Sequence, residues 1–88
     1  MNSTILTQLY REFFGAEPTK MEKLPASGSA REYWRIYNGN ETYIGTINAD
    51  LRENTLFIEY SKYFKEQGVA VPEIICCSPD NSAYIQED

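Results

Sequence analysis

The chain has 88 residues, enough for one small domain, and its 42% of hydrophobic residues allows a core. The 8 basic and 13 acidic residues give a net charge of -5, which argues against binding to nucleic acid or to an anionic membrane surface. The chain contains no histidine, which excludes a histidine general base, a histidine-containing catalytic triad and a histidine-ligated metal from these residues.

The first predicted element is a helix over residues 3–14. Apolar side chains recur there at helical spacing, at Ile5, Leu6, Leu9, Tyr10, Phe13 and Phe14. Ser3 is suited to cap the start of this helix, and Gly15 to end it.

Three strands are predicted next. The first covers about residues 21–26 and the second about residues 32–37, with a loop of small residues between them. Asn38, Gly39 and Asn40 then form a strong hairpin signal, because these residue types tolerate the positive φ angles of a tight turn. We therefore expect a third strand over residues 42–47, antiparallel to the second.

A second helix is predicted over about residues 54–67, ending at Gly68, with its inward face formed by Phe57, Tyr60 or Ser61, and Phe64. A fourth strand over residues 71–77, a turn at residues 78–81 and a fifth strand over residues 83–86 complete the chain. The predicted fold is a single α+β domain over residues 1–88, with helices packed on a five-stranded antiparallel sheet.

The two cysteines, Cys76 and Cys77, are adjacent and would point to opposite faces of a strand, so we expect apolar fillers or idle thiols rather than a disulfide or a metal site. No apolar run approaches the roughly 20 residues that span a bilayer, and Met1 begins a polar stretch without the features of a signal peptide. We therefore expect a cytoplasmic protein.

The loop Ser27–Ala30 is the first candidate site. Its small side chains would let successive backbone N–H groups approach a phosphate, although the same residues also suit a plain hairpin turn. Arg31 and Arg35 follow at once and would either add positive charge beside the loop or form a surface ion pair with Glu32 or Glu53.

Four segments together resemble the small lobe of the aminoglycoside phosphotransferase and choline kinase-like superfamily, in its sugar-kinase branches. They are the loop and strand at residues 27–35, Glu53-Asn54 with Phe57 at a helix start, residues 68–74 with Val71-Pro72-Glu73-Ile74, and the final segment Tyr84–Asp88. The resemblance covers about residues 22–88 and implies a protein-kinase-like N-lobe, a five-stranded antiparallel sheet with an N-terminal helix and a helix between strands 3 and 4.

The resemblance implies an ATP-binding lobe of a small-molecule kinase that uses Mg²⁺ and phosphorylates a hydroxyl of a sugar, aminoglycoside or choline-like acceptor. The hinge backbone near residues 86–88 would pair with the adenine edge, and Ile36 and Ile44 would sandwich the ring. The residues implied at the nucleotide site are Ser27, Gly28, Ser29, Ala30, Arg31, Arg35, Glu59, Gln86, Glu87 and Asp88.

Two features depart from the family. Kinases of this fold commonly place a lysine on the third strand, paired with a glutamate of the following helix, and residues 42–48 contain no lysine. Glu53 and Glu59 are candidate glutamates, and Arg35 is the substitute cation that the sequence suggests. The catalytic aspartate and the metal ligands belong to a large lobe beyond Asp88, so no catalytic or metal-binding residue is assigned here.

We therefore expect these residues alone to be inactive and to self-associate through an exposed lobe face. A non-catalytic interaction domain and a degenerate kinase lobe remain the alternatives. Two minor alternatives are a base-stacking platform of Tyr33, Trp34 and Tyr37, against ordinary packing, and an acid/base pair of Glu87 and Asp88, against a hinge.

Overall fold

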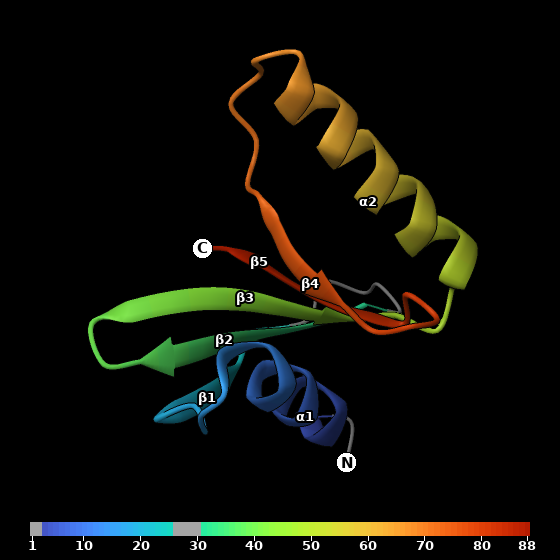
Figure 1. Cartoon of the computed structure of the whole chain (residues 1–88). Coiled ribbons are helices and arrows are strands. Elements are labelled where there is room, and N and C mark those ends of the chain that lie inside the picture. Colours follow the sequence, from blue (N-terminus) through green and yellow to red (C-terminus); the bar gives the residue numbers. More distant parts are fainter. Residues whose placement is uncertain (1–2, 26–30) are drawn as a thin grey trace.

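A computed structural model describes residues 3–25 and 31–88 and confirms an α+β fold with a five-stranded antiparallel sheet (Figure 1). In chain order the elements are α1 (Ser3–Phe14), β1 (Lys20–Lys23), β2 (Glu32–Asn38), β3 (Glu41–Ile47), α2 (Leu51–Glu66), β4 (Ile74–Cys77) and β5 (Ala83–Glu87). The helices α1 and α2 lie on opposite faces of the sheet. No helix of the described residues is both long enough and apolar enough to cross a membrane.

The strands lie in the order β1-β2-β3-β5-β4, and every neighbouring pair is antiparallel. The predicted hairpin is confirmed: Asn38 pairs with Glu41 across the turn between β2 and β3. Gly39 has a φ of 61° in that turn, a backbone conformation that L side chains rarely adopt. The turn residues therefore set the register of these two strands.

The main core lies between α1 and the sheet. Leu6, Leu9 and Tyr10 of α1 pack with the buried strand residues Ile36, Ala83 and Ile85. The helix approaches β3 most closely at Gly45, where a Cβ atom would lie 2.9 Å from both δ-methyl carbons of Leu6. A larger residue at this position would overpack the core.

The second helix packs differently from the prediction. Its buried residues are Asn54 and Ile58, whereas Tyr60 is 59% exposed and Phe64 is 42% exposed. Phe57 stacks on Tyr84 with ring centroids 5.5 Å apart, but the helix then leaves the sheet, and its C-terminal half has no layer beneath it (Figure 1). The predicted inward face was therefore wrong at Tyr60 and Phe64.

The first residues of α2 and of β4 differ from the prediction, and each difference has a local cause. The second helix begins at Leu51 because the Asp50 side chain caps it, accepting a hydrogen bond of 3.0 Å from the Glu53 amide. The fourth strand begins only at Ile74, after Pro72, which has no N–H to offer a neighbouring strand.

The two cysteines are free, as predicted, and half-buried. Cys76 lies opposite Ile85 and packs against the α1 core, while Cys77 lies opposite Tyr84. Burial raises the pKa of the Cys76 thiol to about 11, which disfavours the reactive thiolate. Cys76 is therefore a core filler.

Candidate functional site

The candidate site lies on the sheet face that packs against α2. Side chains alternate between the two faces of each strand, and the register aligns those of the α2 face into cross-strand pairs. These pairs are Tyr33 with Thr46, Arg35 with Ile44, Ile44 with Gln86, and Thr46 with Tyr84. The helix α2 lies over only one end of this face (Figure 1).

Arg31 is the first described residue after the small-residue loop, since Ser27–Ala30 lie outside the described residues. Its Nε atom donates to the Glu53 carboxylate at 3.0 Å, and its Nη1 atom lies 3.4 Å from the Tyr33 hydroxyl. Its guanidinium carbon lies 5.8 Å from the centroid of the Phe57 ring. Of the two roles left open for Arg31, the ion pair with Glu53 is present, and it joins the end of the loop to α2.

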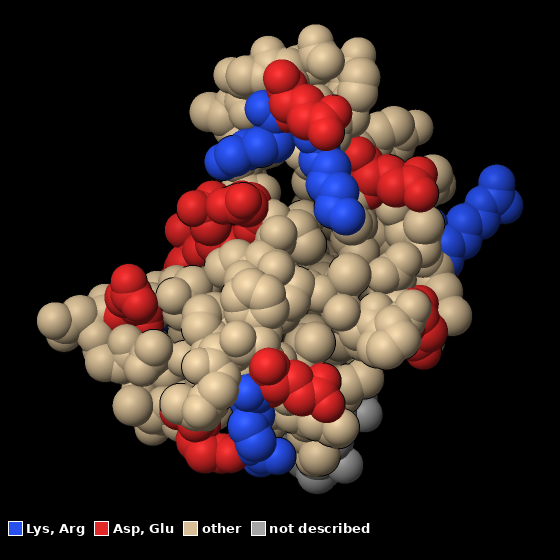
Figure 2. Space-filling model, viewed as in Figure 1, with Lys and Arg blue, Asp and Glu red and all other residues tan. Residues whose placement is uncertain are grey.

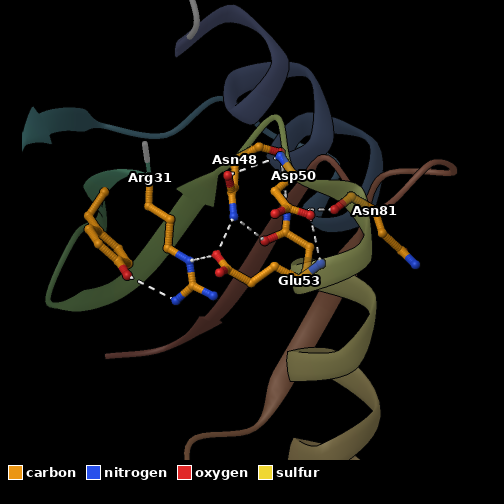
Figure 3. Close-up of polar contacts among 7 residues, drawn as sticks. Arg31, Asn48, Asp50, Glu53 and Asn81 are labelled. Atoms are coloured by element: carbon orange, nitrogen blue, oxygen red, sulfur yellow. Dashed lines mark hydrogen bonds and ion pairs between the residues drawn. The ribbon is translucent and has the colours of Figure 1, made fainter. Parts of the chain in front are cut away.

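A network of asparagines holds this ion pair in place (Figure 3). Asn48 Nδ2 donates to the Glu53 carboxylate at 2.9 Å and to Asn54 Oδ1 at 3.2 Å. Asn54 Nδ2 donates in turn to the backbone carbonyls of Asn48 and Asn81, at 3.3 and 2.7 Å. The buried side chains of Asn48 and Asn54 thus tie the end of β3, the first turn of α2 and the β4–β5 turn together.

Arg35 lies in a second cluster on the same face. Its Nε atom donates to the Asp88 carboxylate at 2.9 Å, and the Thr42 hydroxyl donates to the same oxygen at 2.6 Å. These hydrogen bonds, first that of Thr42 and then that of Arg35, lower the pKa of Asp88. Arg35 therefore forms an ion pair, but with Asp88 and not with the predicted Glu32 or Glu53, and the α2 glutamate Glu53 pairs with Arg31 instead.

The other predicted site residues lie at different places. Gln86 sits inside the sheet, between Ile44 and Ile74. The Glu87 amide donates to the Glu73 carbonyl at 3.0 Å, so the fold already uses this hinge donor, and the Glu87 carboxylate accepts from the Glu73 amide. Glu59 is exposed on α2. Glu87 and Asp88 have separate partners, so they do not form a carboxylate pair.

Two further interpretations fail because of strand alternation. Ile36 is fully buried in the α1 core, on the face opposite to Ile44, so these two side chains cannot sandwich one ring. Trp34 packs toward the same core, whereas Tyr33 and Tyr37 point to the α2 face. The three aromatic residues therefore form no common stacking platform.

The sequence reasoning did not single out Thr46, which is 1% exposed and lies on this face opposite Tyr33 and Tyr84. Asn54 was named only as part of a helix start, and Asn48 was missed, although Asn48-Ala49-Asp50 directly before a helix suits an Asx turn that leads into the capping residue Asp50.

Apart from the α2 face, the described residues also form a cleft beside α1. A cleft of about 390 Å³ lies between α1 and the β4–β5 turn, and no predicted site residue lines it. The described part of the chain contains no group of three or more metal-ligating side chains. Comparisons with protein-family models, with curated proteins and with solved structures give no match.

Proposed function

We propose that this chain is the ATP-binding lobe of a kinase-like phosphotransferase that acts on a hydroxyl of a sugar, aminoglycoside or choline-like acceptor. One observation carries the proposal: Arg31, Arg35 and Asp88, which the resemblance marks as site residues, have their contacts on one face of the sheet. Strand alternation puts Arg31 and Arg35 on the same face, and the pairing of β3 with β5 brings Asp88, 53 residues away in the sequence, beside Arg35.

The order of the elements also supports the proposal. The resemblance implies five antiparallel strands, a leading helix and a second helix between strands 3 and 4, and the fold has this arrangement. The second helix begins beside the end of the small-residue loop, through the Arg31–Glu53 pair. The guanidinium of Arg31 therefore lies beside the first turn of α2, which supports a role for Arg31 near the phosphates of ATP.

The residues present fit ATP better than they fit its metal. The guanidinium of Arg31, next to the small-residue loop, suits the oxygens of a triphosphate, which supplies the transferred phosphoryl group when ATP is bound. Mg²⁺ needs several oxygen ligands, and the described carboxylates form no such group. The proposal therefore assigns Mg²⁺ and the catalytic carboxylate to a second lobe, and to this chain the binding and orientation of the nucleotide.

The test is a titration of the 88-residue chain with ATP, followed by amide NMR. We expect saturable shifts at Gly28, Arg31 and Asp88, and smaller ones along α1. Absence of saturable shifts at millimolar ATP, or shifts confined to the cleft beside α1, would overturn the proposal. Measurable phosphoryl transfer by these residues alone would instead overturn the assignment of catalysis to another lobe.

A second candidate function, an interaction domain, is favoured by the exposed apolar side chains of α2. Leu56, Tyr60, Tyr63 and Phe64 are each at least 42% exposed, and they recur at helical spacing. Under this alternative the chain associates through α2, with itself or with a partner. A concentration series by size-exclusion chromatography tests self-association: the change Tyr60→Ser should lower the apparent mass, whereas a monomer at high concentration would contradict it.

A further inference from the structure

We propose that Asn38 is a site of spontaneous covalent modification, at which the side-chain amide is lost and an isoaspartyl linkage forms, and that Thr19 restrains this reaction in the folded chain. The site is the turn at the tip of the β2–β3 hairpin, at the left margin of the molecule in Figure 1. The inference is independent of the function proposed above.

The reaction is a ring closure between a side chain and the backbone. The backbone nitrogen that follows an asparagine attacks the side-chain carbonyl carbon, so a new C–N bond forms and the Cγ–Nδ2 bond breaks. The proton of the backbone amide leaves with the side-chain nitrogen as ammonia. Water then opens the cyclic imide at either carbonyl: opening at the main-chain carbonyl gives the isoaspartyl linkage, and opening at the other gives aspartate. Water is the only co-reactant.

The turn is where the chain is most open to this attack. The attack is fastest when glycine follows the asparagine, because no side chain then crowds the nitrogen, and Asn38 is the one asparagine of the chain that precedes a glycine. Asn38 and Gly39 are exposed, and a Cβ atom at Gly39 would meet no atom within 4 Å. Asn48 and Asn54, by contrast, are buried.

The hairpin needs the glycine that makes Asn38 vulnerable. Of the two central residues of the turn, Gly39 has a positive φ, of 61°, and Asn40 does not. These are the φ signs of a type II′ turn, in which glycine occupies the first central position. A side chain at position 39 would slow the attack, but it would also strain the turn that pairs β2 with β3.

The native conformation opposes the ring closure in two ways. Closure requires the Cβ of Asn38 and the nitrogen of Gly39 to lie on the same side of the Cα–C bond, whereas Asn38 ends β2, and an antiparallel strand has a ψ of about +135°. The Gly39 amide also donates to Thr19 Oγ1 at 3.3 Å, and the Thr19 hydroxyl donates to the Tyr37 carbonyl at 3.0 Å. The proton that must leave is therefore held by a second segment, and the reaction proceeds when this end of the hairpin opens.

The modification weakens the hairpin that carries it. Asn38 lies opposite Glu41 across the turn, so either product places a carboxylate opposite the Glu41 carboxylate. Like charges directly opposite each other destabilise a pair of strands. The isoaspartyl linkage also adds one methylene to the backbone, which disturbs the register of β2 with β3. We therefore expect the modified chain to unfold at a lower urea concentration.

The first experiment assigns the site. The 88-residue chain is incubated at neutral pH, and the mass increase of one dalton, the ammonia released and the position of the isoaspartyl linkage are followed by peptide mapping with an isoaspartyl methyltransferase. Asn38 should react first, and Asn38→Gln should remove most of the ammonia release. Asn40 is the internal control, because it lies in the same exposed turn and a glutamate follows it. Earlier reaction at Asn40, or at any other asparagine, overturns the assignment.

The second experiment tests the restraint by Thr19. Thr19→Val removes the hydroxyl and keeps the shape, so it should speed the reaction at Asn38 in buffer about fivefold, the value of one hydrogen bond. Thr19→Ser retains the hydroxyl and should keep the rate within about twofold of wild type. Thr4→Val, the same change at an exposed position of α1, is the matched control and should also stay within about twofold.

The unfolded chain separates the restraint from the intrinsic chemistry. In concentrated urea the contact with Thr19 is absent, so Thr19→Val and wild type should react at Asn38 at the same rate, and faster than wild type does in buffer. Equal rates of Thr19→Val and wild type in buffer contradict the role of Thr19. Equal rates of wild type in buffer and in urea contradict any protection by the hairpin.

Discussion

The change Asn54→Asp tests whether the buried asparagine network holds α2 on the sheet. Asn54 is fully buried, and its Nδ2 donates to two backbone carbonyls, those of Asn48 and Asn81. A carboxylate has nearly the same shape as the amide but only accepts hydrogen bonds. It would therefore place an oxygen against two carbonyl oxygens.

The buried carboxyl of the variant can stay charged or take up a proton, and the less costly of these two states sets the loss of stability. Keeping the buried charge unpaired costs about 3–5 kcal/mol. Protonating the carboxyl at pH 7 costs about 4 kcal/mol, because its ordinary pKa is about 3.9 and each pH unit above the pKa costs about 1.36 kcal/mol. The protonated carboxyl has one O–H donor in place of the two N–H donors of the amide, so it restores only part of the network. We expect the free energy of unfolding to fall by about 4 kcal/mol at pH 7, a large share of the roughly 5–15 kcal/mol of a small domain.

The cost should depend on pH in a defined direction. Burial raises the pKa of the introduced carboxyl in the folded state, so the folded state binds more protons than the unfolded state above about pH 4. The stability of the variant relative to wild type is therefore greatest below about pH 4. It falls by about 1.4 kcal/mol per unit as the pH rises toward the folded-state pKa, and is constant above it.

The assay is urea unfolding of the variant and of wild type at several pH values between about 3.5 and 7.5. The quantity compared at each pH is the difference between their free energies of unfolding. Asn40→Asp is the matched control, because it makes the same chemical change at an exposed position of the hairpin turn and should cost less than about 0.5 kcal/mol. If Asn54→Asp behaves like this control, or if its cost does not change with pH, the network does not bear on stability as we argue.

Three further predictions follow from single contacts. Gly45→Ala should lower the free energy of unfolding by about 1–3 kcal/mol in urea unfolding, because its Cβ would press on the Leu6 methyls; unchanged stability would mean that α1 can shift. Arg35→Gln should raise the pKa of the Asp88 side chain, as measured by carboxyl ¹³C NMR, and an unchanged titration would contradict the ion pair. In wild type, the stability that this carboxylate adds should be lost as the pH falls through the lowered pKa of Asp88. Cys76 should be alkylated by iodoacetamide at pH 8 much more slowly in the folded chain than in urea, since its thiol pKa is about 11; equal rates would show that it is accessible and ionised.

The parts of the fold that depend on local patterns could be predicted from the sequence. The turn residues around Gly39 identify the hairpin, and the apolar spacing identifies both helices. The inward face of α2 could not be read in this way, because Asn54 is buried through hydrogen bonds to backbone groups 6 and 27 residues away. Arg35 and Asp88 are 53 residues apart, and nothing local links them. Insertion of β5 between β3 and β4 brings them together.

By contrast, a glycine in the sequence indicates which face of the sheet carries the candidate site. A glycine inside a predicted strand marks a place where another segment approaches the backbone, and Gly45 is where the methyl groups of Leu6 lie against β3. Since side chains alternate, the neighbours of Gly45 on β3, Ile44 and Thr46, must point away from α1. The hairpin register then places Tyr33 and Arg35 on that same face. The strand glycine and the turn glycine together therefore suffice to separate Ile36 from Ile44, and to place Tyr33 and Arg35 on the face opposite to α1.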